Sequence, residues 1–185
     1  MMPAQISVRL LLSFGLPLTV ALAASVSLAY ADDPCAAFTW DVRHERALSG
    51  KEPQAPIGGQ ALAASPALDA DRLYQVELSG QSEVKFLEPP GKKRGEGRAY
   101  AGLARLTVDT PGVYRISLDP PLWVDVIANG TVVPAKDFQG RPGCNAPHKI
   151  VEFVLPARVP ITLQFSGTGV PTVKVTVTRP PAAAS

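Results

Sequence analysis

The chain has 185 residues, with 18 Lys and Arg against 16 Asp and Glu, which gives a formal net charge of +2. A chain this close to neutrality has no general electrostatic attraction for nucleic acid, so we expect no nucleic-acid partner. Its 19 Pro and 15 Gly residues are too many for a helical bundle and are typical of short strands joined by tight turns.

The first 31 residues have the pattern of a cleavable export signal. Arg9 is the one charged side chain, an apolar run over residues 10–24 follows it, and Ala29-Tyr30-Ala31 matches a small-x-small cleavage site. The run is shorter than the roughly 20 residues that a membrane-spanning helix needs, and Pro17 interrupts it. We expect a signal peptide over residues 1–31 and a soluble, periplasmic or secreted mature protein that does not span a membrane. An uncleaved N-terminal anchor is the alternative.

The mature chain, residues 32–185, has the size of one ordinary domain and is long enough to bury a complete core. It contains two cysteines, Cys35 and Cys144, and an even number of cysteines in an oxidising compartment predicts a disulfide. A metal-binding or redox pair is the alternative, although the C-x-x-C spacing typical of such pairs is missing.

Period-two alternation of apolar residues predicts most of the fold. It places strands near residues 74–78, 84–86, 114–118, 151–155, 161–165 and 173–177. Residues 122–127 are apolar on both faces and predict a central strand. Asn129-Gly130 predicts a tight hairpin to residues 131–133, because a type I′ turn needs two residues at positive φ. Roughly eight strands indicate an all-β, antiparallel β-sandwich, with a small β-barrel as the alternative.

Three further segments are less regular. Residues 36–42 are interpreted as a first strand, with a turn of helix as the alternative for residues 43–48. Residues 49–71 are rich in Pro, Gly and Ala and lack a sustained apolar period, so we expect a long surface connection. The segment from Pro134 to His148 is interpreted as a loop of about 15 residues, a length that is often functional.

This late loop is the first candidate for a binding site. Its candidate contacts are Lys136, Phe138, Arg141 and His148. Phe138 offers an apolar contact, while the basic side chains favour an anionic or polar partner, and Cys144 would hold the loop in place. A structural lid over one end of the core is the alternative.

A glycine-rich basic loop over residues 91–98 is the second candidate. Its basic side chains are Lys92, Lys93, Arg94 and Arg98, which suit an anionic component of the cell envelope. A solvated hairpin tip that keeps a sheet edge soluble is the alternative. Trp40 and Trp123 are aromatic platforms for a ligand if they are exposed, and the apolar neighbours of Trp123 favour the core instead.

The sequence offers one arrangement for metal chemistry. His44, His148 and Glu152 together make a two-histidine, one-carboxylate set, the basis for an alternative hypothesis of an envelope metalloenzyme or iron-dependent dioxygenase. Glu152, however, lies in an alternating strand, where we expect it to face solvent. Nucleophile-elbow, zincin, phosphate-loop and dinucleotide motifs are all missing from the sequence. We therefore expect no cofactor and lean towards a protein that is not an enzyme.

Residues 112–127 contain a G-x-Y and a W-x-D-V strand, residues 149–155 a K-x-V-x-F strand, and residues 161–167 an L-Q-x-S strand. This pattern, over about half of the mature chain, resembles a group of small exported proteins of unknown function. The layout is also similar to β-sandwiches of the pre-peptidase C-terminal type, which accompany secreted enzymes. That similarity implies a non-catalytic binding or accessory module whose partner is an unknown envelope component or protein.

Some members of the small group carry the name homogentisate 1,2-dioxygenase. True homogentisate dioxygenases resemble much longer cupins, whose iron is held by two His and one Glu. The two histidines of this chain lie far apart in sequence, at His44 and His148. The name therefore implies no catalytic residue at any position here.

Overall fold

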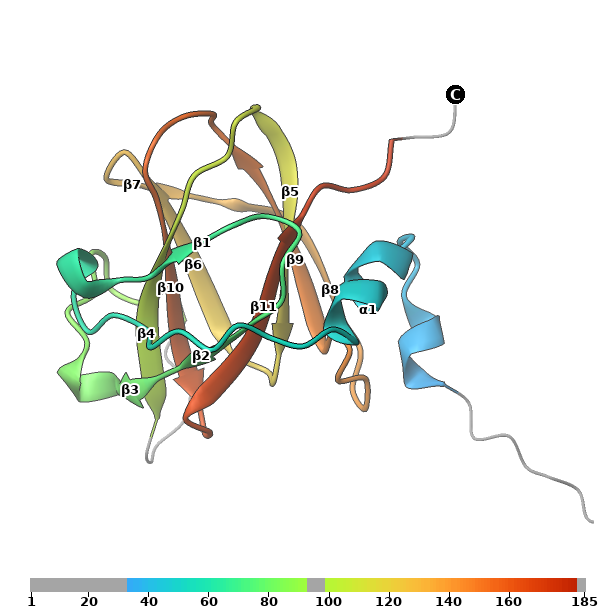
Figure 1. The fold of residues 1–185 in the computed structure, drawn as a ribbon, viewed down its shortest axis with the longest axis horizontal. Helices are drawn as coiled ribbons and strands as arrows, with labels where there is room; N and C mark the ends of the chain where they lie inside the picture. Colours follow the sequence, from blue (N-terminus) through green and yellow to red (C-terminus); the bar gives the residue numbers. More distant parts are fainter. Residues whose placement is uncertain (1–32, 93–98, 183–185) are drawn as a thin grey trace, which may run out of the picture. The chain divides into compact units, whose positions relative to one another are not determined.

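The computed structural model describes residues 33–92 and 99–182, which form a sandwich of two β-sheets (Figure 1). The predicted signal peptide, residues 1–31, lies outside the described residues, as do Lys93, Arg94 and Arg98 of the basic loop. Within the described ranges, no helix has both the length and the apolar character needed to cross a membrane. The strands belong to two separate sheets, so the predicted sandwich is confirmed and the small barrel is not formed.

The six-stranded sheet has the order β1-β4-β10-β6-β7, with β3 also pairing with β4. Its strands are β1 (Ala67–Leu68), β3 (Ser79–Gly80), β4 (Tyr100–Leu106), β6 (Trp123–Ala128), β7 (Thr131–Val133) and β10 (Ile161–Thr168). The five-stranded sheet has the order β2-β11-β5-β9-β8. Its strands are β2 (Tyr74–Glu77), β5 (Gly112–Asp119), β8 (Ala135–Gly140), β9 (Lys149–Leu155) and β11 (Thr172–Thr178). The long strands pair in antiparallel fashion, as the alternating pattern predicts.

The hydrophobic core fills the space between the sheets. It is built from the alternating residues of the predicted strands, among them Ile116, Phe153, Leu163, Phe165 and Val175, all at most 2% exposed. Each such side chain stabilises the fold by about 1.5–3 kcal/mol when it is fully buried. The alternation in β5, β9, β10 and β11 therefore follows directly from one face of each strand meeting this core.

The outer face of the five-stranded sheet is covered by the N-terminal segment. This segment comprises a short 3-10 helix, η1 (Pro34–Ala37), and the helix α1 (Arg43–Ser49). The strand predicted over residues 36–42 is wrong, and the alternative of a helical turn at residues 43–48 is correct. Phe38 and Val42 are apolar because they pack on Ile150 of β9, rather than because they alternate in a sheet.

The disulfide predicted between Cys35 and Cys144 is confirmed. The two residues are 109 positions apart in sequence, and their Cα atoms lie 4.9 Å apart. Both cysteines are buried in the small cluster that also contains Phe38 and Ile150. The bridge therefore holds the N-terminal segment against the loop that follows β8.

The outer face of the six-stranded sheet is covered by the segment before β4. A 3-10 helix, η3 (Gln81–Glu83), opens this segment, and Val84 packs on Ala101 and Leu103. The side chain of Gln164 fastens it, because Oε1 accepts hydrogen bonds from the backbone N–H groups of Leu87 and Glu88 at 2.6 and 3.3 Å. The strand predicted near residues 84–86 is therefore wrong. Its apolar residues belong instead to a segment that covers the outer face of the sheet.

The connection over residues 49–71 runs along the sheets and is hydrogen-bonded to them. Gly59 exchanges backbone hydrogen bonds with Leu103 of β4, at 2.8 and 2.9 Å. A Cβ atom on Gly59 would lie 2.7 Å from the Cα of Ser65, so this close passage requires glycine. The connection also contains a 3-10 helix, η2 (Leu62–Ala64), and the edge strand β1.

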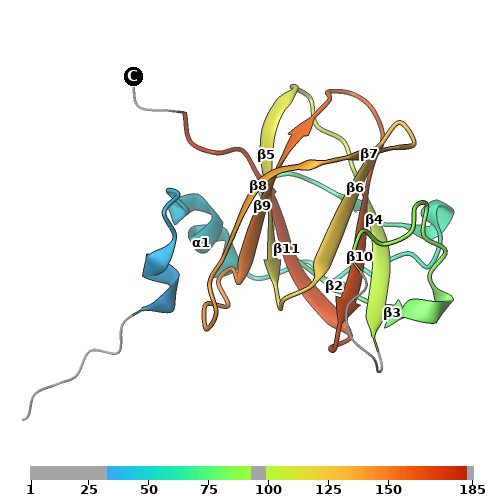
Figure 2. The same ribbon diagram turned by 180° about the vertical axis from the view of Figure 1, so that it is seen from behind.

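The chain changes from one sheet to the other at Pro134. The predicted Asn129-Gly130 hairpin is confirmed, with φ angles of 50° and 72° at its two turn residues, and it joins β6 to β7. β8 follows at once and pairs with β9 of the other sheet (Figure 2). The long loop predicted from Pro134 to His148 is therefore wrong in its first half, which forms an edge strand. This crossing brings β6 and β8 to the same side of the sandwich.

Candidate binding site

A groove of about 520 Å³ opens between β6 of one sheet and β8 and β9 of the other. Small-molecule sites in proteins usually have volumes of about 300–1,000 Å³. We call this hollow the β6–β8 groove. Its buried apolar lining is Leu122, Val124 and Val151, its aromatic lining is Trp123 and Phe138, and its basic lining is Lys92, Lys136 and Lys149. The groove therefore combines an apolar interior with positive charge.

Phe138 provides the largest exposed apolar surface of the groove. Its Cα pairs with that of Val151, and cross-strand partners carry their side chains on the same face of a sheet. Val151 belongs to the hydrophobic core, so Phe138 faces the opening between the two sheets. Phe138 nevertheless remains 64% exposed, because no described part of the chain covers it. The apolar surface that begins in the core therefore becomes exposed to solvent at Phe138.

Trp123 is held in place by Asp125. The indole Nε1–H donates a hydrogen bond to Asp125 Oδ1 at 2.7 Å, and the backbone N–H of Gly91 donates to Asp125 Oδ2 at 3.1 Å. A Cβ atom on Gly91 would lie 2.8 Å from the Asp125 carboxylate and 3.1 Å from the indole nitrogen. A larger residue would have to displace the Asp125 carboxylate, so glycine suits this approach, and the following residue, Lys92, lies at the groove.

Lys149 lies beside both aromatic rings. Its Nζ is 5.1 Å from the centroid of the Trp123 ring and 5.5 Å from that of Phe138. Both distances are within the range in which an ammonium group is attracted to an aromatic face. The positive charge of Lys149 is therefore placed next to the apolar surface that a ligand would contact.

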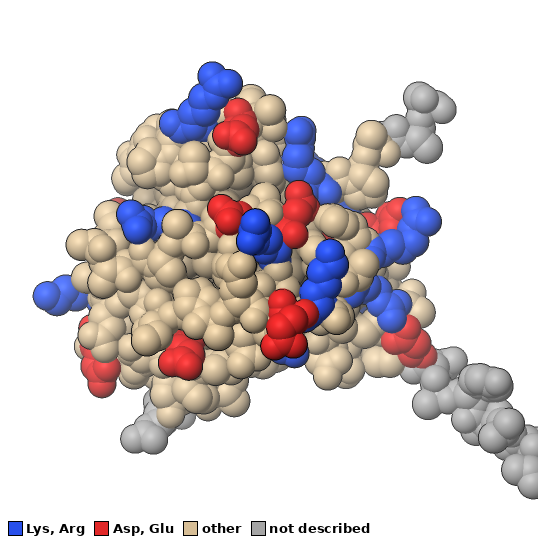
Figure 3. Space-filling model, in the orientation of Figure 1, with Lys and Arg blue, Asp and Glu red and all other residues tan. Residues whose placement is uncertain are grey.

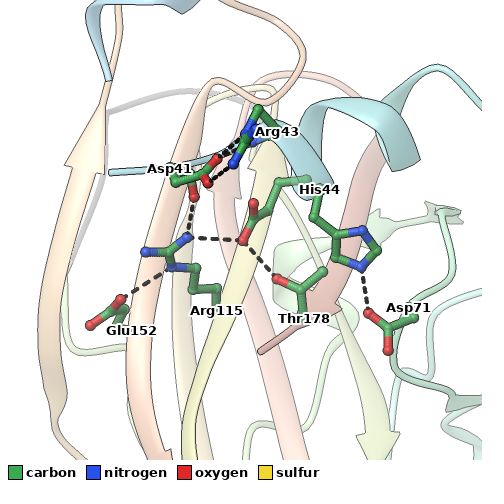
Figure 4. A network of polar contacts seen from close by, with 8 residues as sticks. Asp41, Arg43, His44, Asp71, Arg115, Glu152 and Thr178 are labelled. Carbon is green, nitrogen blue, oxygen red and sulfur yellow. Dashed lines mark hydrogen bonds and ion pairs between the residues drawn. The ribbon is translucent and has the colours of Figure 1, made fainter. Parts of the chain in front are cut away.

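Lys136 is anchored to a buried ionic network. Its Nζ donates to Glu152 Oε2 at 2.9 Å, and the other oxygen of Glu152 accepts from Arg115 Nε at 3.1 Å. Arg115 also contacts Glu45 Oε1 at 3.3 Å, and the hydroxyl of Thr178 donates to that same atom at 2.9 Å (Figure 4). Lys136, with a side chain that is 51% exposed, forms the end of this network at the edge strand β8, on the same face of the sheet as Glu152.

The remaining members of the network in Figure 4 lie at the surface. The backbone oxygen of Asp41 accepts from Arg115 Nη1 at 2.7 Å, while its carboxylate pairs with the exposed Arg43. The hydrogen bonds from Arg43 lower the pKa of Asp41 to about 2. Asp41 is therefore ionised at any pH that a folded protein normally meets.

The structure does not assemble the proposed metal ligands. His44 pairs with Asp71 at 2.8 Å, Glu152 is held by Arg115 and Lys136, and His148 lines the groove. Within residues 33–92 and 99–182, no three His, Cys, Asp or Glu side chains are placed to hold a metal ion. Glu152 is also buried rather than facing solvent, because Arg115 and the N-terminal segment cover its face of β9.

The groove brings together residues of both candidate loops. Lys136, Phe138 and His148 line it together with Lys92 from the basic loop. Arg141 does not join them: its Nε donates to the backbone oxygen of Ala37 at 2.6 Å, and its guanidinium lies over the Phe38 ring. Arg141 therefore fastens the N-terminal segment, and its interpretation as a binding residue is not supported by these contacts.

Lys149 does not appear among the candidates from the sequence, whereas Trp123 was considered as an aromatic platform with the core favoured. The indole of Trp123 lies on the groove beside Asp125. Lys149 begins the strand that contains Val151, and the period of two places both on the face that meets the other sheet. That parity is the signal from which Lys149 was predictable.

A comparison with protein-family models finds no match, and a search of the curated proteins finds none either. The resemblance to small exported proteins therefore stays a prediction. The chemistry of the β6–β8 groove is the basis for a functional inference.

Proposed function

We propose that this protein is an exported, non-catalytic binding module that holds a small ligand with an apolar body in the β6–β8 groove. The observation that carries the proposal is Phe138, an aromatic side chain that is 64% exposed and faces the opening between the sheets. Full burial of a Phe side chain is worth about 1.5–3 kcal/mol, so a ligand that covers it gains part of this free energy. Trp123 offers a second aromatic contact in the same groove.

A small ligand fits this site better than an extended peptide. An added strand would have to pair with the free edge of β8, but the N–H of Phe138 already donates to Asp137 Oδ1 at 2.7 Å. Further along β8, the side chain of Gln139 accepts a hydrogen bond from the backbone N–H of Thr39 at 2.9 Å. These contacts occupy the edge, whereas the hollow beside it is left open by residues 33–92 and 99–182.

Two further observations support the proposal. The Cys35–Cys144 disulfide favours a periplasmic or secreted location, because such bridges persist in oxidising compartments. On the face drawn in Figure 3, basic and acidic side chains are intermixed. That face therefore has no broad surface of one charge to attract a partner. This favours recognition of a ligand in a confined site.

The Phe138→Ala variant tests the proposal directly. With anilinonaphthalene sulfonate as a fluorescent probe, we expect the variant to bind about tenfold more weakly than the wild type, a loss of about 1.4 kcal/mol. Its free energy of unfolding should change by less than about 0.5 kcal/mol, since the ring is largely exposed. The matched control is Ile57→Ala, which removes an exposed apolar side chain (70% exposed) that does not line the groove. Equal probe binding by all three proteins would contradict the proposal.

Arg141→Ala should give the opposite pattern. This variant removes the hydrogen bond to Ala37 and the contact with Phe38, so we expect the free energy of unfolding to fall by about 1–2 kcal/mol. Probe binding should stay at the wild-type level, because the side chain does not line the groove. Urea denaturation and probe titration measure the two quantities separately. Weakened probe binding at unchanged stability would show that Arg141 is a binding residue after all.

A further inference from the structure

The interface between α1 and the outer face of the five-stranded sheet contains two buried hydroxyl groups. Ser117 of β5 and Thr176 of β11 are cross-strand partners, so their side chains lie on the same face of the sheet. Two positions along the two strands, Arg115 and Thr178 occupy this face and contact Glu45 of α1. The helix therefore covers the face that carries Ser117 and Thr176, which are each 2% exposed.

The hydroxyls of Ser117 and Thr176 have no hydrogen-bond partner within residues 33–92 and 99–182. Buried hydroxyls in proteins normally have a partner, because a polar group that leaves water without compensation destabilises the fold. The two residues are direct partners in the sheet, yet they form no hydrogen bond with each other. Their position beside each other therefore indicates that both bind one small polar partner.

A small pocket lies at this position. It leaves about 10 Å³ for the centre of a water-sized sphere, and Ser49 of α1, Ser117 and Thr176 are among its lining residues. One water molecule needs about 10–15 Å³ in a cavity, together with two to four polar partners. Ser49 Oγ donates to the backbone oxygen of Glu45 at 2.9 Å, and a hydroxyl that donates still has lone pairs that accept. The pocket thus suits one water molecule in size and in chemistry.

We propose that this pocket binds a structural water molecule, which joins the hydroxyls of Ser117 and Thr176 to α1 through Ser49. A water molecule has two donors and two acceptor sites, so it can serve three hydroxyls at once. This inference is independent of the proposed function, because the pocket and the β6–β8 groove share no lining residue. The water adds a neutral link between helix and sheet beside the ionic link that Arg115 makes with Glu45.

Oxygen-17 relaxation dispersion tests the inference, because it counts the water molecules that a protein holds for longer than it takes to tumble. We expect Ser117→Ala combined with Thr176→Val to hold about one long-lived water fewer than the wild type. Valine has nearly the shape of threonine, so the variant removes the hydroxyls and leaves the pocket filled to the same extent. Ser82→Ala combined with Thr131→Val is the matched control, since both residues are exposed and lie outside the pocket. It should hold as many waters as the wild type.

A high-resolution crystal structure of the wild type gives a second test that does not depend on folding of a variant. We expect an ordered water at about 2.7–3.0 Å from both Ser117 Oγ and Thr176 Oγ1. A direct hydrogen bond between these two hydroxyls, with no water beside them, would overturn the inference. An equal number of long-lived waters in the wild type and in the folded Ser117→Ala, Thr176→Val variant would overturn it as well.

Discussion

Replacement of Arg115 by Met is expected to lower the free energy of unfolding by about 3–5 kcal/mol, the usual cost of removing one partner from a buried ion pair. The side chain of Arg115 is 6% exposed and lies between the carboxylates of Glu45 and Glu152, which are 0% and 8% exposed. Without the guanidinium, Glu152 keeps Lys136, but Glu45 keeps only the hydroxyl of Thr178. Urea denaturation of the variant and the wild type measures the loss.

The position of Glu45 explains why this loss should be large. Glu45 Oε2 is buried and has no hydrogen-bond partner within the described part of the chain, so the carboxylate already depends on Arg115 for compensation. A buried charge without a partner is among the most destabilising features a protein can contain. The network thus holds α1 against β5 and β9 only as long as its central cation is present.

Two further variants show whether uncompensated charge is the cause. Arg43→Met is the control, because it removes an exposed arginine that pairs with the carboxylate of Asp41 in solvent (Figure 4). The free energy of unfolding of this variant should stay close to that of the wild type. Arg115→Met combined with Glu45→Gln and Glu152→Gln should recover part of the loss, since no buried charge then lacks a partner. If the triple variant is less stable than Arg115→Met alone, packing rather than charge accounts for the effect.

The sequence predicted those strands whose apolar residues alternate. β5, β9, β10 and β11 each place one face against the core, so the period of two was visible. β4 escaped prediction because it contains Ala101, Gly102 and Ala104, small residues that give no alternating signal although the strand is buried. Its burial on both faces depends on the segment around Val84, which packs on its outer side.

The candidate site was predicted in part. Lys136, Phe138 and His148 were identified from their residue types, but the segment was expected to be a loop, and its strand character arises from pairing with β9. Arg141 was assigned to the same site because arginines often bind anions. Its true partner, Ala37, is 104 residues away in sequence and becomes a neighbour only through the fold. Local patterns do not contain such contacts.

Removal of the disulfide is expected to lower the free energy of unfolding by about 4–5 kcal/mol, the loop-closure value for a bridge of this span. The bridge joins Cys35 to Cys144 across 109 positions, and replacement of both by Ala frees that loop in the unfolded chain. The wild type should also contain no titratable thiol under denaturing conditions. Two thiols in the purified, unreduced protein would contradict the bridge, and the reduced wild type should match the double variant in stability.

The disulfide and Arg115 secure the same segment from two sides. Cys35 fixes η1 to the loop after β8, while Arg115 binds the backbone of Asp41 and the carboxylate of Glu45 a few residues later. Once either anchor is lost, the segment is free to detach, and the second loss then removes contacts that are already weakened. We therefore expect a double-mutant cycle to show a combined loss at least about 1 kcal/mol smaller than the sum of the separate losses. Strict additivity would show that the disulfide acts only through the unfolded chain, independently of the contacts that Arg115 makes in the folded protein.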